Sequence, residues 1–267
     1  MSIRSSLSPI LPEAAVRITL LQFAPVFEDR AASRDRVGTL LAEVESDWIL
    51  LPEMALSGFT MNVAAASWDG MDEAFVASLA RGKKAYVTIG GVKDGRNCAF
   101  TYGRDGRLLS VYEKRHLFSP SAEGESYSAG ETTSILSLAE KEGEKDAGEL
   151  RVGPSICYDL RFPYHFWNLA PQVEAFFAIA SWPASRREHW KTLLAARAIE
   201  NQAFVIGVNR TGSSPDTDYS GDSAIIDPRG RSILECGSAE GAFSADIDPE
   251  SARAWRRSFG AMADRLE

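Results

Sequence analysis

The chain has 267 residues, 45% of them hydrophobic, and carries a formal net charge of −8 at pH 7. This length and hydrophobic content can bury a full core, while the scattered acidic residues leave no basic face for nucleic acid or an anionic membrane. No run of the sequence approaches the roughly 20 apolar residues that a membrane-spanning helix requires. We therefore expect small-molecule partners, with neither nucleic acid nor membrane among them.

The first fifteen residues lack the uninterrupted apolar core of a signal peptide, because two prolines and Glu13 break the one candidate. We expect residues 1–15 to be a flexible N-terminal extension and residues 16–267 to form a single domain. The cysteines, Cys98, Cys157 and Cys236, are few, odd in number and widely spaced, which argues against a disulfide framework. These features favour the cytoplasm.

In the first half of the chain, strands and helices alternate. Dense apolar runs predict strands at 17–23, 47–53 and 84–92. Apolar residues at helical spacing between Val37 and Val44 predict a helix with Ser33 as its N-cap, and residues 72–81 are predicted as a second helix. Residues 97–102 and 108–112 flank a Gly-rich turn, so a hairpin is expected to close this half.

The second half repeats this order. Strands are predicted at 149–159, 173–181 and 203–210, helices at 164–169 and 189–202, a hairpin at 223–235, and a C-terminal helix starting near Pro249. The segment 140–148, dense in Glu and Lys, is expected to be an exposed flexible insert. Two such halves predict an α/β fold in which two sheets pack face to face beneath outer helices.

Three ionisable residues stand at the ends of β-rich runs. Glu53 follows a strand in WILLPEMALSGF, Lys114 follows another in SVYEKRHLF, and Cys157 follows a third in GPSICYDLRFP. Parallel sheets place their ligands at the carboxyl ends of their strands. Taken singly, each residue has an ordinary structural interpretation, which for Cys157 is a small buried hydrophobe.

Taken together, these residues in their local contexts resemble the Glu-Lys-Cys triad of the nitrilase, or carbon–nitrogen hydrolase, superfamily. More narrowly, CYDLRFP, ASWPASRREHW and ARAIENQAFVIGVNR resemble the omega-amidase branch, whose members hydrolyse the terminal amide of dicarboxylate monoamides such as 2-oxoglutaramate. The resemblance implies a four-layer α-β-β-α sandwich that pairs into homodimers. Glu123 has the spacing of a second glutamate that, in the family, positions the lysine and the attacking amide or water.

This triad can hydrolyse an amide without a metal or an organic cofactor. Cys157 would attack the carbonyl carbon while its proton passes to Glu53, which would then protonate the departing ammonia. The Lys114 ammonium and the backbone N–H of Tyr158 would stabilise the oxyanion. Water, activated by Glu53, would then hydrolyse the thioester.

An omega-amidase must also bind a distant carboxylate, for which the planar fork of arginine is suited. We expect Arg186 to be this residue, with Arg187, Arg115 and Arg210 as alternatives. An equal alternative for Arg186 is a solvated position on a loop with no role in binding. Trp182 is interpreted as either a wall of the pocket or a core aromatic.

A neighbouring charged pair has a structural interpretation. Arg161 is expected to form an ion pair with Asp159 that fixes the turn after the nucleophile. Arg197 and Glu200 share a helix face and are expected to brace it or a dimer contact.

Other functions remain open at this stage. A Cys-His hydrolase could use His116, His165 or His189, although no fixed motif supports it, and a metal site is weaker because these histidines lack paired ligands. Hydrolysis of other small amides or of nitriles on the same triad is a further alternative. Tyr158-Asp159 argues against nitriles, since nitrilases usually have Trp-Glu there. A catalytically silent binding module would tolerate loss of a triad residue, yet all three are present.

Overall fold

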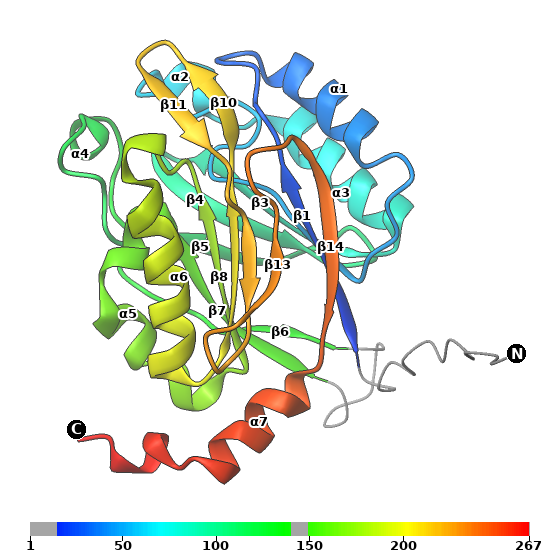
Figure 1. Ribbon diagram of the computed structural model, residues 1–267. Helices are drawn as coiled ribbons and strands as arrows, with labels where there is room; N and C mark the ends of the chain where they lie inside the picture. The colour runs from blue at the N-terminus through cyan, green and yellow to red at the C-terminus, as the bar shows by residue number, and fades with distance from the viewer. Residues whose placement is uncertain (1–14, 140–148, 267) are drawn as a thin grey trace, which may run out of the picture.

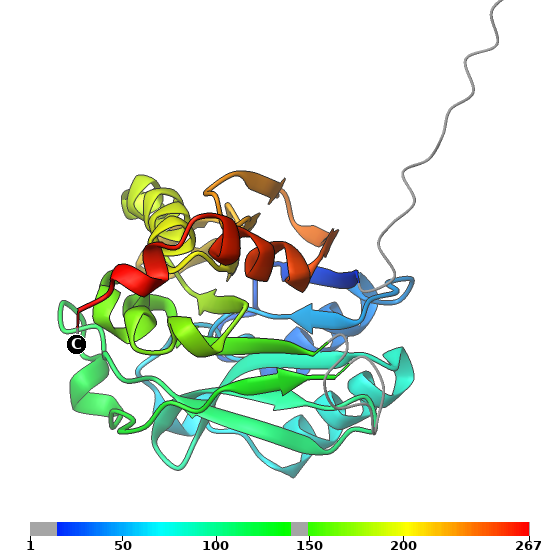
Figure 2. The same ribbon diagram turned by 90° about the horizontal axis from the view of Figure 1, so that it is seen from below.

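The computed structural model describes residues 15–139 and 149–266. All but the last residue of the predicted N-terminal extension, and the whole of the predicted insert at 140–148, lie outside the described residues. The described chain folds into two six-stranded sheets that lie face to face between helices (Figures 1 and 2). This is the predicted α-β-β-α sandwich.

The first sheet contains three parallel strands flanked by antiparallel ones. Its order is β14 (Gly241–Ile247), β1 (Val16–Gln22), β2 (Trp48–Leu50), β3 (Tyr86–Lys93), β4 (Arg96–Tyr102) and β5 (Leu108–Glu113). Strands β1, β2 and β3 run parallel, and β4 and β5 form the predicted hairpin.

The second sheet has the same plan. Its order is β13 (Ser232–Glu235), β12 (Ala224–Ile226), β9 (Phe204–Asn209), β8 (Ala175–Ala180), β7 (Leu150–Ile156) and β6 (Leu136–Leu138). Strands β7, β8 and β9 run parallel, β12 and β13 form a hairpin, and β6 adds an antiparallel edge. The internal repeat suggested by the sequence is therefore present in the topology.

The helices are α1 (Arg30–Leu40), α2 (Val63–Ala66), α3 (Gly70–Lys83), α4 (Glu123–Ser126), α5 (Pro163–Trp167), α6 (Arg187–Asn201) and α7 (Pro249–Ser258). Helices α1 and α3 lie on the outer side of the first sheet, and α5 and α6 lie on that of the second, whereas α4 lies on a loop and α7 below the sheets (Figure 1). Short 3₁₀ turns occupy Cys157–Arg161, Ala170–Gln172, Ala184–Arg186 and Ala261–Asp264. None of the helices in the described ranges is both long and apolar enough to cross a bilayer.

Strand alternation divides the core into layers, as β2 illustrates. Trp48 and Leu50 face the second sheet, where the Trp48 and Phe177 rings meet edge to face with centroids 6.0 Å apart. Ile49 faces the other way and packs in the cluster that includes Val76 of α3. Because β2 is buried on both faces, it reads as a continuous apolar run with no polar alternation.

The structure corrects one helix boundary. Ser33 was predicted as the N-cap, but α1 begins earlier, and the Asp29 side chain caps it by accepting a hydrogen bond from the Ala32 backbone N–H at 2.9 Å. Ser33 lies inside the helix, buried, and its hydroxyl binds Val26. The helix also ends before Val44.

Strands β6, β10, β11 and β14 and the short helices α2 and α4 were not predicted from the sequence. Strand β14 returns from the C-terminal part of the chain and pairs antiparallel with β1 along its whole length. A separate hairpin, β10 (Thr211–Ser214) with β11 (Thr217–Ser220), rises at one end of the molecule (Figure 1).

Candidate active site

Each of the three ionisable residues lies where its strand ends, as predicted. Lys114 directly follows β5, Glu53 lies three residues beyond β2, and Cys157 directly follows β7. Cys157 has a backbone φ of +48°, in the left-handed region that a residue with a side chain seldom adopts. Surrounding contacts must hold such a residue in place, and strained backbone of this kind is frequent at active sites.

The Lys114 side chain is fully buried between two carboxylates. Its Nζ donates to Glu53 Oε1 at 2.7 Å and to both carboxylate oxygens of Glu123 at 2.9 Å. Burial alone would lower the pKa of Lys114, but the two neighbouring carboxylates outweigh it and raise the pKa above its usual value. The side chain is therefore an ammonium at neutral pH.

Both carboxylates are held by further donors. Asn97 Nδ2 bridges them, donating to Glu53 Oε1 at 2.8 Å and to Glu123 Oε1 at 2.9 Å. The Ser181 backbone N–H donates to Glu53 Oε2 at 2.9 Å, and the Phe118 backbone N–H donates to Glu123 Oε2 at 2.6 Å. This shell fixes the two side chains in one orientation each.

The Cys157 thiol lies at the edge of this charged cluster, and the residue is 9% exposed. Burial raises its pKa well above the usual value, the Glu53 carboxylate raises it further, and the Lys114 ammonium opposes both. The resting sulfur is thus a thiol that needs a proton acceptor before it can attack.

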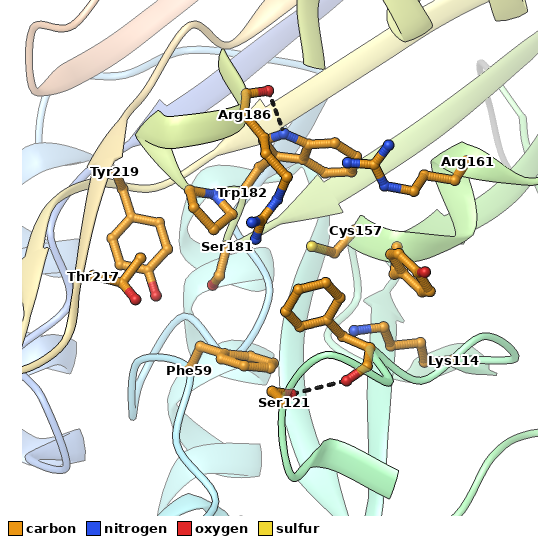
Figure 3. Close-up of a pocket in the computed structure, with 13 residues that line it drawn as sticks. Phe59, Lys114, Ser121, Cys157, Arg161, Ser181, Trp182, Arg186, Thr217 and Tyr219 are labelled. Carbon is orange, nitrogen blue, oxygen red and sulfur yellow. Dashed lines mark hydrogen bonds between the residues drawn. The ribbon is translucent and has the colours of Figure 1, made fainter. Parts of the chain in front are cut away.

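A cavity of about 130 Å³ opens onto the cluster (Figure 3). Cys157 and Lys114 line it, whereas Glu53 has no exposed surface and lies behind the lining residues Lys114 and Ser181. The cavity therefore brings a small molecule to the partly exposed Cys157, with the buried Lys114 ammonium in its wall and the Glu53 carboxylate behind that wall.

The three residues predicted to bind substrate, Tyr158, Trp182 and Arg186, all line this cavity. Trp182 is 2% exposed and donates from Nε1 to the Arg186 carbonyl oxygen at 2.8 Å, so it belongs to both the wall and the core. The Arg186 guanidinium extends into the cavity (Figure 3). It lies 5.1 Å from the centroid of the Phe118 ring.

The predicted Arg161–Asp159 ion pair is wrong. The 3₁₀ turn directs Asp159 into the interior, where it binds other partners, and directs Arg161 into the cavity. The Arg161 guanidinium lies over the Trp182 ring (Figure 3), 4.8 Å from its centroid. Its Nη2 is 3.2 Å from His189 Nδ1. Asp159 and Arg161 therefore do not pair, although they have opposite charges and lie two residues apart.

The alternative arginines lie outside the lining. Arg187 forms an ion pair with Asp222 at 2.7 Å, and Arg210 is buried over the Tyr219 ring, 4.2 Å from its centroid. Arg115 is not among the lining residues either. Arg197 and Glu200, which were predicted to brace one helix face or a dimer contact, form an ion pair on that face with 2.7 Å between Nη1 and Oε1.

Several lining residues were missed from the sequence. They are Phe59, Phe118, Ser121, Arg161, Ser181, Pro183, Thr217 and Tyr219. Ser181 directly follows β8, so the rule that identified Cys157 could have found it. Thr217 and Tyr219 belong to the unpredicted hairpin β10–β11.

None of the three histidines lines the cavity. His116, His165 and Asp159 bring potential metal ligands within 4.8 Å of one another. Hydrogen bonds account for most of this group, because His116 Nδ1 donates to Asp159 at 2.7 Å and His165 Nε2 donates to the Pro154 carbonyl at 2.8 Å. His165 Nδ1 has no hydrogen-bond partner among the described residues. Cys157 therefore has Lys114 as its basic neighbour and no histidine.

Known proteins share this sequence pattern over nearly the whole chain. The family model for carbon-nitrogen hydrolases matches residues 17–257. Omega-amidase YafV of Escherichia coli K12 is 35% identical over 260 residues, covering 94% of this chain and 97% of the relative. The 2-oxoglutaramate amidase of Bacillus subtilis is 34% identical, covering 82% of this chain and 85% of the relative.

Solved structures share the fold. XC1258 from Xanthomonas campestris, described as a CN-hydrolase superfamily protein with an arsenic adduct in its active site, has a TM-score of 0.86 at 32% identity, covering 95% of this chain and 98% of its own. Saccharomyces cerevisiae Nit3, a nitrilase superfamily member, has a TM-score of 0.78 at 23% identity, covering 92% and 94% of the two chains. The chain therefore belongs to the carbon-nitrogen hydrolase family.

Proposed function

We propose that the protein is an omega-amidase, which hydrolyses the terminal amide of a dicarboxylate monoamide such as 2-oxoglutaramate to the acid and ammonia. The relatives named omega-amidase and 2-oxoglutaramate amidase support this substrate class. One observation carries the proposal: the cavity lined by Cys157 and Lys114 also contains the guanidinium of Arg186. A short anion can therefore meet a cation at one end and the nucleophile at the other.

Acylation begins when Cys157 Sγ forms a bond to the amide carbon and its proton passes to the Glu53 carboxylate. The negative charge that develops on the amide oxygen is stabilised by the Lys114 ammonium, with the Tyr158 backbone N–H as second donor. The C–N bond then breaks, Glu53 returns the proton to the leaving nitrogen, and ammonia departs. The product is a thioester on Cys157.

Deacylation uses the same groups in reverse order. Water attacks the thioester carbon while Glu53 takes one of its protons, and the C–S bond breaks as the sulfur is protonated again. Glu123 keeps Lys114 in place through both steps, since it holds Nζ by two contacts of 2.9 Å. These steps use only protein groups and water.

Arg186 is the proposed partner of the distal carboxylate. Among the described residues, the structure records no carboxylate bound to its guanidinium, which contacts the Phe118 ring. A guanidinium with free donors in a small, mainly apolar cavity favours an anionic ligand. Arg161 contributes a second positive charge to the same cavity.

The test measures ammonia release from 2-oxoglutaramate and from an uncharged amide of similar length. Arg186→Ala is expected to lower kcat/KM for the anionic substrate about 10- to 100-fold, because a hydrogen bond to a charged group contributes roughly 1.5–3 kcal/mol. The uncharged amide should lose less than about threefold. Cys157→Ala should abolish turnover of both substrates while the protein stays folded.

Arg187→Ala is the matched control, because its guanidinium pairs with Asp222 outside the cavity and should affect neither substrate. Equal losses on both substrates would remove Arg186 from carboxylate recognition. Absence of turnover on every dicarboxylate monoamide would overturn the omega-amidase assignment.

We also propose a cytoplasmic homodimer. The three free cysteines suit a reducing compartment. The exposed Tyr164 of α5 and Ile199 of α6, at 51% and 56% exposure, support a contact between copies across these helices.

A further inference from the structure

One buried carboxylate, that of Asp159, binds both segments that carry Lys114 and Cys157. Its side chain has no exposed surface. The Tyr112 hydroxyl donates to Oδ2 at 2.7 Å, and the Ile156 backbone N–H donates to the same oxygen at 3.0 Å. Tyr112 belongs to β5 and Ile156 ends β7, so this oxygen already joins the first sheet to the second.

His116 binds the other oxygen twice. Its backbone N–H donates to Asp159 Oδ1 at 2.9 Å, and its ring donates from Nδ1 at 2.7 Å. With the proton on Nδ1, the ring nitrogen Nε2 accepts a hydrogen bond from the Tyr164 hydroxyl, with 2.7 Å between the two atoms. The ring also stacks on Phe162, with centroids 3.9 Å apart. The His116 ring that donates to the carboxylate is thus itself held by two other contacts.

The residues that donate to Asp159 lie close to Lys114 and Cys157 in the sequence. Tyr112 and His116 lie two residues before and two residues after Lys114, and Ile156 directly precedes Cys157. The carboxylate therefore fixes the flanks of the ammonium relative to the turn that presents the sulfur. That turn includes the left-handed φ of +48° at Cys157, which the contacts around it must maintain.

We propose that Asp159 is a positioning residue, whose four hydrogen bonds set the location of the Lys114 ammonium relative to the Cys157 sulfur. The proposal rests on the proposed function only in taking Cys157 as the nucleophile. Asp159 acts through its neighbours, because it is fully buried and does not line the cavity.

This role has an electrostatic signature. Burial and Glu53 raise the pKa of Cys157, while the Lys114 ammonium lowers it. If loss of the Asp159 bonds lets the ammonium move away, the pKa of Cys157 rises further. Loss of the negative charge of Asp159 by itself would act in the opposite direction and lower that pKa. The sign of the shift therefore separates geometry from simple charge removal.

Asp159→Asn tests the proposal, because an amide of the same size cannot accept hydrogen bonds at both of its ends. Alkylation of Cys157 by iodoacetamide, followed by mass spectrometry from pH 6 to pH 11, should show a midpoint at higher pH than in the wild type. With 2-oxoglutaramate, kcat should fall about 10- to 100-fold, as small misplacements of reacting groups do, with KM changed by less than about threefold.

Glu174→Gln is the matched control. Glu174, directly before β8, is also a buried carboxylate, but it binds Arg151 and Arg253 at the opposite end of β7. The Glu174→Gln substitution should lower the unfolding temperature but leave the pH midpoint of Cys157 alkylation and kcat unchanged. Tyr112→Phe, which removes one hydrogen bond and no charge, should move the midpoint upward by a smaller amount.

An unchanged or lower midpoint in Asp159→Asn overturns the proposal, as does an equal upward shift in Glu174→Gln. If Asp159→Asn does not fold, Tyr112→Phe decides, and an unchanged midpoint in that variant is the contrary result. Alkylation needs no substrate, so failure of the omega-amidase assignment would appear separately, as lack of turnover in the wild type with the midpoint shifts intact.

Discussion

Replacing Lys114 with methionine should destabilise the protein as well as inactivate it. The ammonium has no exposed surface and makes three contacts of 2.7–2.9 Å to Glu53 and Glu123. Methionine fills similar volume but leaves two carboxylates buried together without a cation. Removing one partner of a buried ion pair typically costs about 3–5 kcal/mol. For a chain of this size, that corresponds to a fall of roughly 6–20 °C in unfolding temperature.

The pH dependence of this loss follows from the direction of the pKa shifts. The folded-state pKa of Lys114 is raised, so its stabilisation is fully present below its unfolded value and is constant between pH 5 and pH 8. In the variant, the two unpaired carboxylates repel each other, and proton uptake by one of them relieves this repulsion. The difference in stability between wild type and Lys114→Met should therefore be larger at pH 8 than at pH 5.

Thermal unfolding followed by circular dichroism at these two pH values measures the effect. The double variant Lys114→Met/Glu123→Gln should recover part of the lost stability at pH 8, because it removes one of the two uncompensated charges. It should recover no activity. A single variant as stable as the wild type, or a double variant less stable than the single one, would refute the assignment of Lys114 as the cation that stabilises this buried cluster.

Two other predictions concern packing and assembly. Gly90→Ala should reduce both stability and turnover, because a Cβ on Gly90 of β3 would lie 2.5 Å from Glu53 Cα and must displace that backbone. Gly38→Ala is the control, because Gly38 lies in the interior of α1 with no atom within 4 Å of the added Cβ, and it should stabilise the protein by about 0.5–1 kcal/mol. Normal turnover in Gly90→Ala would contradict this prediction. Light scattering at micromolar concentration should give a mass near twice the 29.1 kDa of the chain, and a single species of 29.1 kDa would exclude the dimer.

The sequence was most informative where apolar runs end at one ionisable residue. Glu53 and Cys157 follow β2 and β7, which are buried parallel strands and therefore continuous apolar runs that are easy to delimit. Lys114 follows β5, a mostly exposed antiparallel strand at the edge of its sheet, and its local context SVYEKRHLF identified it. Glu123 could be proposed only from family resemblance, since its four-residue helix has no periodicity to detect.

Partners distant in sequence were beyond the reach of local patterns. Asp159 has Arg161 as its opposite charge nearby in sequence, yet it binds Tyr112 and His116, more than forty residues away. The hairpin β10–β11 reads as TGSS and TDYS, a composition typical of loops, so Tyr219 was not placed at the cavity. Contacts between segments distant in sequence therefore determine both the partners of Asp159 and the position of Tyr219.

The pairing of β14 with β1 has a consequence for the order of folding. These strands are joined through contacts as distant as Arg17 with Asp246, which are 229 residues apart. During synthesis, the strands of the second sheet are complete before β14 leaves the ribosome, whereas β1 has one unpaired edge until β14 has been made. Closure of so long a loop is slow, and an open strand edge invites association with other chains. The second sheet, which presents Cys157, should therefore form before the first sheet is completed. Truncation of the chain before Gly241 should yield aggregates in place of a monomeric fragment.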